Sequence, residues 1–140
     1  MKWFAEEVYQ LTNSEREKHG VPKLNRANAS LETAAYVRAE EISVVWGHTR
    51  PNGTEFHTAM TEAGYTTWRS AGENIAKVWP YSPDKGYEDI PKMMVDGLMS
   101  SEGHKDNILN PVYKILSVGV FHDNRPEAEY AIYMVQLFSD

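Results

Sequence analysis

The first third of the chain carries apolar residues at the spacing of two α-helices. Phe4, Val8 and Leu11 recur every three or four positions with polar residues between them, which predicts a helix that ends near Gly20. Residues 25–30 are predicted to form a loop that caps a second helix. The apolar stripe of this second helix is expected to consist of Leu31, Ala34, Ala35, Val37, Ala39 and Ile42.

The middle of the chain contains shorter elements. The Pro-Asn-Gly run at 51–53 predicts a turn, and Thr54 is the expected cap of a short helix over 55–63 that Gly64 ends. Residues 68–79 are predicted to be extended, and residues 80–86 to be a loop. A fourth helix is predicted to begin at Pro91 and to end at 101–103, followed by a tight turn over 107–111. Its apolar face is expected to consist of Met93, Met94, Leu98 and Met99.

The last third of the chain has the pattern of a β-hairpin. Residues 115–121 and 130–138 are apolar or alternate, and a polar turn at 123–127 separates them. Helices followed by a terminal hairpin favour an α+β fold over a doubly wound parallel sheet, and we expect one domain over residues 1–140. The predicted core includes Val8, Leu11, Ala35, Ile75, Met94, Leu98, Val118 and Val135.

Composition removes several classes of function. The 140 residues carry a net charge of −6 and contain no cysteine, so disulfides, thiolate catalysis and cysteine-ligated zinc are excluded. No basic cluster offsets the acidic balance, and a nucleic-acid partner is therefore not expected. The helical pattern begins with the first residues, so we expect neither a signal peptide nor a transmembrane segment in this chain. No cofactor is required for folding at this length.

Three ionisable residues stand out from the background. His48 and His104 each follow a glycine and lie in predicted breaks between elements, where functional side chains concentrate. Glu73 lies in an extended run with apolar neighbours and needs a partner if it is buried. The spacing of the three matches no local ligand motif, so these residues alone leave a shared site open. Surface or capping positions are predicted for His19, His57 and His122.

Five short motifs occur in one order along the chain. They are HTRPNG at 48–53, AGENI at 71–75, SEGHKDNILNP at 101–111, VGV at 118–120 and VQLF at 135–138. Together with the first helix at 11–20, they resemble the CAP superfamily in its bacterial, SCP-domain form, over residues 4–138. This resemblance implies a three-layer α–β–α sandwich with a small antiparallel sheet, and an extracellular or cell-surface location.

The resemblance also implies a central cleft that holds two histidines and two glutamates. His48 and His104 match the histidines, and Glu73 matches the glutamate of the Gly-Glu-Asn motif. Ser101 occupies the place of the second glutamate, and its neighbour Glu102 would substitute only if the helix end rotates. The tetrad is therefore incomplete. The disulfides and sterol-binding loops of eukaryotic members have no counterpart here.

Three further residues are expected beside this cleft. Asn74, Asn107 and Arg50 are predicted to be its structural neighbours. We expect Asn107 to hold the turn after His104 through side-chain to backbone hydrogen bonds.

Three interpretations of the cleft remain open at this point. The first is a binding or interaction module that takes a divalent cation such as zinc at His48 and His104, a small polar ligand, a peptide or a cell-surface partner. The second is a hydrolase that uses metal-bound water or Ser101. The third is a structural polar cluster that binds nothing tightly. No catalytic residue is assigned from the sequence.

Overall fold

The computed structural model describes residues 2–78 and 87–140. The chain begins with helix α1 (Lys2–Lys18), the short strand β1 (Asn25–Arg26), helix α2 (Ala29–Val44) and helix α3 (Thr58–Glu62). Strand β2 (Ala71–Val78), helices α4 (Ile90–Met99) and α5 (Glu102–Leu109), and strand β3 (Ile115–His122) follow. A short 3-10 helix, η2 (Pro126–Ala128), lies in the connection to the last strand, β4 (Ile132–Ser139).

The strands form one mixed sheet in the order β1-β3-β4-β2. β4 lies between β3 and β2 and is antiparallel to both, so the predicted terminal hairpin is confirmed. β1 runs parallel to β3 through Asn25 and Arg26 alone, which makes the sheet mixed rather than purely antiparallel. The α+β class predicted from the order of elements is confirmed.

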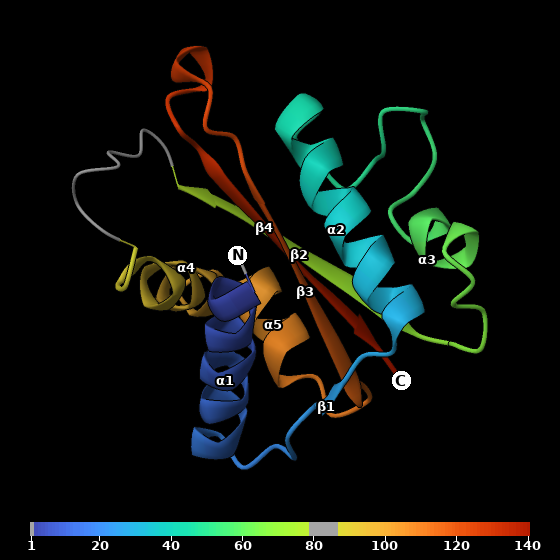
Figure 1. The fold of residues 1–140 in the computed structure, drawn as a ribbon. Helices are drawn as coiled ribbons and strands as arrows, with labels where there is room; N and C mark the ends of the chain where they lie inside the picture. The colour runs from blue at the N-terminus through green and yellow to red at the C-terminus, as the bar shows by residue number, and fades with distance from the viewer. Residues whose placement is uncertain (1, 79–86) are drawn as a thin grey trace.

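Helices cover both faces of the sheet, with α1, α4 and α5 on one side and α2 and α3 on the other (Figure 1). Each face has its own apolar core, because successive side chains of a strand point to opposite faces. The core under α1 includes Phe4, Val8, Met94, Leu98, Ile108, Leu116 and Phe138. The core under α2 includes Leu31, Ala35, Ile42, Met60, Ile75, Val135 and Leu137.

Most of the predicted core residues are buried. Leu11 and Val118 are only partly buried and pack at the margin of the core under α1. Met93, expected on the apolar face of the fourth helix, is 58% exposed. The fully or nearly buried members of the predicted set are Val8, Ala35, Ile75, Met94, Leu98 and Val135.

The helix ends mostly follow the local signals in the sequence. The chain leaves α1 through Gly20, whose φ of +74° suits a residue without a Cβ. Asn28 caps α2 by accepting a hydrogen bond from the backbone N–H of Leu31. Pro91 lies in the first turn of α4, where its missing N–H costs no helical hydrogen bond.

Several predicted boundaries are wrong. α3 begins at Thr58 rather than at residue 55, because Thr54 bonds Asn52 and Thr58 in a turn instead of capping a helix. Strand β2 begins at Ala71, so residues 68–70 are not part of it. The expected end of this strand at residue 79 and the loop at 80–86 lie outside the described residues.

The largest error concerns residues 102–109, where a break and a tight turn were predicted. They form helix α5, and Ser101 stands at its N-cap position. His104 and Asn107 therefore lie on a helix. Ile108 is the single buried residue of α5, so this helix lacks the apolar stripe by which an amphipathic helix is recognised.

α2 and β3 approach each other closely at Gly119. A Cβ added to Gly119 would overlap the backbone carbonyl of Ala35 on α2. Because that neighbour is backbone and not a flexible side chain, only glycine permits this spacing between helix and sheet.

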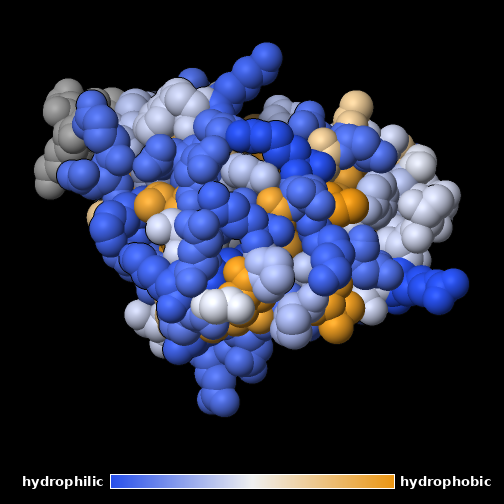
Figure 2. Space-filling model, turned by 90° about the horizontal axis from the view of Figure 1, so that it is seen from below, coloured by the Kyte–Doolittle hydropathy of each residue, from blue (hydrophilic) through white to orange (hydrophobic). Residues whose placement is uncertain are grey.

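The described part of the chain has no helix that is both long and apolar enough to cross a bilayer. The face seen in Figure 2 is mostly hydrophilic, and its hydrophobic side chains show as separate small areas. This agrees with the acidic balance of the sequence.

Candidate functional site

The candidate site lies around the edge strand β2. Two consecutive residues of this strand, Glu73 and Asn74, contact the helices on opposite faces of the sheet. Glu73 and Asn74 are both buried. Their side chains point to opposite faces of the sheet, as neighbours on a strand do. Glu73 meets residues of α2 and of the loop after it, whereas Asn74 meets α5.

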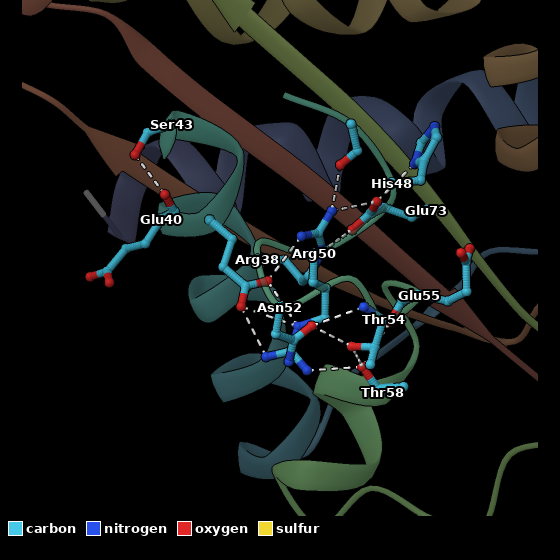
Figure 3. A network of polar contacts seen from close by, with 12 residues as sticks. Arg38, Glu40, Ser43, His48, Arg50, Asn52, Thr54, Glu55, Thr58 and Glu73 are labelled. Atoms are coloured by element: carbon cyan, nitrogen blue, oxygen red, sulfur yellow. Dashed lines mark hydrogen bonds and ion pairs between the residues drawn. The ribbon is translucent and has the colours of Figure 1, made fainter. Parts of the chain in front are cut away.

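Glu73 holds His48 from the side of α2. Its Oε1 lies 2.8 Å from Nδ1 of His48 and accepts a hydrogen bond of 3.0 Å from Arg38 Nη2. Its Oε2 accepts a hydrogen bond of 2.7 Å from Arg38 Nε, so that arginine and carboxylate form a bidentate pair (Figure 3). The side chains of Glu73 and Arg38 are fully buried, whereas that of His48 is 50% exposed. A rigid, buried ion pair thus positions an accessible imidazole.

Arg38 extends this network to the loop that carries His48. Its Nη2 donates to the backbone carbonyl of Gly47, and its Nη1 donates to Glu41 at 2.9 Å. Glu41 in turn accepts hydrogen bonds from Arg50. Arg50, predicted beside the cleft, therefore reaches the site through Glu41 and Arg38 and supports it from a distance (Figure 3).

Asn74 holds α5 from the opposite side. Its Nδ2 donates to the backbone carbonyl of His104 and to Gln136 Oε1, each at 3.0 Å. Asn107 Nδ2 donates to Asn74 Oδ1 at 2.9 Å and approaches the carbonyl of Glu73 at 3.4 Å. The predicted role of Asn107 is therefore wrong in detail. Residues 102–109 are helical, so no turn follows His104. Asn107 instead joins α5 to β2 through its hydrogen bond to Asn74.

The ring of His104 has a partner on its own helix. Ser101 Oγ lies 2.8 Å from Nδ1 of His104. A serine at an N-cap position usually accepts a hydrogen bond from the first turn, but Ser101 makes no such bond. The Ser101 hydroxyl instead forms a hydrogen bond with Nδ1 of His104. Glu102 is exposed and has no hydrogen bond or ion pair to either histidine.

The two histidines have opposite electrostatic settings. The hydrogen bond to Glu73 raises the pKa of His48 above its ordinary value. Burial lowers the pKa of His104, and repulsion by a positive charge on His48 lowers it further. Near pH 6.5 the site therefore offers a proton donor at His48 and a proton acceptor at His104.

The donor atoms fit a tight metal site poorly. Within residues 2–78 and 87–140, no group of three or more His, Asp or Glu side chains is arranged to hold an ion. Both oxygens of Glu73 are occupied by Arg38 and His48. Ser101 supplies a neutral hydroxyl where a carboxylate would add charge. What remains for a metal is one ring nitrogen from each histidine.

Sequence reasoning missed Arg38 and Glu41. Arg38 is fully buried and lies on the apolar stripe of α2, between Ala35 and Ile42. A charged residue on such a stripe needs a buried partner of opposite charge, and this signal was available. The sequence could not say that the partner is Glu73.

The remaining histidines take no part in this network. His19 is exposed on the end of α1, as predicted. His57 precedes α3 and packs between Phe56 and Trp68. The predicted solvent-facing position of His122 is wrong, since this side chain is partly buried beside Tyr87.

Sequence comparison places this arrangement in a family. The family model described as "CAP: Cysteine-rich secretory protein family" matches residues 9–138. This chain belongs to the CAP family. The match spans every element of the domain from the middle of α1 to β4, including His48, Glu73 and His104.

Two curated proteins of Bacillus subtilis (strain 168) are similar to this CAP domain. The uncharacterized protein YkwD is 31% identical over 119 residues, which are 83% of this chain and 42% of that protein. The uncharacterized membrane protein YlbC is 32% identical over 116 residues, which are 81% of this chain and 30% of that protein. The CAP domain thus spans less than half the length of these relatives.

Solved structures share the fold of the CAP domain. An extracellular protein containing an SCP domain from Bacillus anthracis has a TM-score of 0.75 at 22% identity, over 99% of this chain and 40% of that one. An outer surface protein from Borrelia burgdorferi has a TM-score of 0.74 at 17% identity, over 99% of this chain and 93% of that one. At these identities the likeness concerns the fold.

Proposed function

We propose that this CAP domain is an extracellular binding module whose cleft takes a small acid or the carboxyl end of a peptide between His48 and His104. The observation that carries the proposal is the buried Arg38–Glu73 pair that holds the half-exposed ring of His48, where the hydrogen bond to Glu73 raises the pKa of that ring. Similar structures that are described as extracellular or outer-surface proteins support the location.

The chemistry of the two rings defines the ligand. Nδ1 of each histidine is engaged, by Glu73 or by Ser101, so Nε2 of each ring is left for a ligand. Protonated His48 donates to an anionic acceptor such as a carboxylate. Neutral His104, in the tautomer whose Nδ1–H donates to Ser101 Oγ, accepts at Nε2 from an N–H group. The last residue of a peptide carries both groups, since its amide N–H and its carboxylate are attached to the same Cα.

The geometry supports binding over hydrolysis. In a serine–histidine–carboxylate triad, one ring nitrogen contacts the serine while a carboxylate orients the other. Here Ser101 meets Nδ1 of His104, and the nearby carboxylate, Glu73, bonds the ring of His48. Glu73, the carboxylate that would have to orient His104 as a general base, is thus hydrogen-bonded to His48 instead.

N-acetylglycine is a suitable first probe, because it carries one carboxylate and one amide N–H. We expect it to bind at about millimolar affinity near pH 6, and to shift the ring-nitrogen NMR signals of His48 and His104. N-methylacetamide, which lacks the carboxylate, is the matched control and should have a much smaller effect. Equal shifts with both compounds, or undiminished binding to His48→Ala, would argue against the proposal.

Zinc should bind weakly, because two imidazoles without a free carboxylate make a poor donor set. We expect micromolar or weaker affinity by calorimetry, and loss of binding in His104→Ala. Both histidines must be neutral to ligate zinc, and the pKa of His48 is raised, so affinity should fall on acidification from above pH 6.5.

Two further zinc titrations make this prediction sharper. Ser101→Glu should tighten binding by adding the carboxylate that the site lacks, whereas His19→Ala, on the end of α1, should leave it unchanged. Nanomolar affinity in the unmodified domain would contradict the prediction.

A further inference from the structure

Strand β3 has a free edge over most of its length. β1 pairs with Ile115 and Leu116 alone. From Ser117 to His122, β4 is the single strand that pairs with β3 among the described residues. The opposite edge of β3 is therefore open to another strand beyond the end of β1.

The register shows which backbone groups point to this open edge. Just after β3, Asp123 donates its backbone N–H to Ala131, in the same register as the β3–β4 pair. Since residues of an antiparallel pair alternate between the two edges, every second residue before Asp123 also bonds β4. The backbone groups of Val118 and Val120 therefore point the other way. The carbonyl of Lys114, four residues before Val118, accepts from Asn25 of β1 on that same side.

The first residues of the open edge form the floor of a groove. A cavity of about 410 Å³ lies there, lined on the α1 side by Lys2, Glu6 and Tyr9, at the start of α2 by Glu32, and on the floor by Ser117 and Val118. Figure 1 shows α1 and α2 on opposite sides of the sheet at this edge. Val118 and Val120, whose backbone groups face the open edge, are only partly exposed, and residues of α1 and the start of α2 line the groove on its two sides, so the edge is recessed between the two helices.

We propose that this groove binds a single extended peptide segment of another protein, which adds a strand to the free edge of β3. A recessed edge admits one narrow strand, whereas the edge of a second copy would carry its own α1 and α2 and collide with these helices. Alternating backbone donors and acceptors are the chemistry that an added strand satisfies. The charged residues of the lining, Lys2 and Arg26 against Glu6 and Glu32, balance, so the backbone of the peptide and not its charge is what the groove recognises. The buried Oγ of Ser117 also lacks a hydrogen-bond partner in the described part of the chain.

Hydrogen exchange tests the open edge directly. In the free domain, the amides of Val118 and Val120 should exchange about 100-fold faster than those of Gly119 and Phe121, which bond β4. Equal protection of the four amides would overturn the proposal. So would protection of Val118 and Val120 that increases with domain concentration, since this would indicate pairing between two copies.

Binding is tested with linear heptapeptides selected from a phage-displayed library on the wild-type domain. A selected peptide should protect the amides of Val118 and Val120, and should lose at least about tenfold in affinity for Val118→Pro, which removes an N–H that the sheet does not use. His48→Ala should bind it unchanged, and this control separates the groove from the cleft around His48 and His104.

Modified peptides keep the test independent of how the proline variant folds. N-methylation of alternate peptide residues should abolish binding in one register and leave it intact in the other, as expected for a strand paired along one edge. Failure to select any peptide, or equal tolerance of both N-methylated forms, would overturn the proposal.

Discussion

Replacing Glu73 with alanine should lower the free energy of unfolding by about 3–5 kcal/mol, because it leaves the buried guanidinium of Arg38 without its main partner. Both side chains of this pair are fully buried. The remaining carboxylate beside Arg38, that of Glu41, is shared with Arg50. The same substitution removes the hydrogen bond that raises the pKa of His48, so this pKa should return toward 6.5.

Chemical denaturation measures the first effect of Glu73→Ala, and NMR of the His48 ring nitrogens against pH measures the second. Glu55→Ala is the matched control. Glu55 is exposed and exerts on His48 the weakest of the charge effects that raise or lower its pKa. An unchanged pKa of His48 in Glu73→Ala would show that the contact with Glu73 does not set the charge of the ring.

Replacing Arg16 with methionine should destabilise the fold by about 3–4 kcal/mol. Arg16 is 1% exposed, and its guanidinium donates to the backbone carbonyls of Pro22, Ile108, Asn110 and Tyr113 at 2.7–3.3 Å. Methionine fills a similar shape but donates no hydrogen bond, so these carbonyls lose their partner at a cost of about 1–3 kcal/mol for each group left buried.

Thermal and urea unfolding of Arg16→Met should be compared with those of Arg26→Met. Arg26 pairs with Glu6 on the surface, where ion pairs contribute little. Similar midpoints for the two variants would mean that the carbonyls around Arg16 find other donors. The position of Arg16 explains why a large loss is expected, since this residue joins α1 to the end of α5 and to the segment that enters β3.

Periodic patterns predicted the parts of the fold that bury a repeating stripe. α1, α2 and α4 each place several residues in a core, and β3 and β4 are two largely apolar runs on either side of a polar turn. β1 has two residues, too few to show a period. α5 buries one residue, and its polar sequence with a glycine after Glu102 resembles a break. Short elements that are held in place mainly by hydrogen bonds show no periodic pattern of apolar residues in the sequence.

The candidate site was likewise predicted only in part from the sequence. The Gly-Glu-Asn motif and the two Gly-His pairs drew attention to His48, Glu73 and His104, and their shared role stays a prediction. The sequence did not reveal that Glu73 and Asn74 hold the two layers from opposite faces of β2. Such pairings depend on how distant segments pack, and for Arg38 and Glu73 they join residues 35 positions apart.

Gly119 has a consequence for the electrostatics of His48, although it lies on β3, two strands away from Glu73 in the sheet. Any side chain at this position would push α2 away from the sheet at Ala35. Arg38 lies less than one turn further along the same helix, so it would withdraw from Glu73 as α2 moved. The protonation of His48 is thus governed in part by the thickness of the sandwich at a residue that touches none of the charged groups.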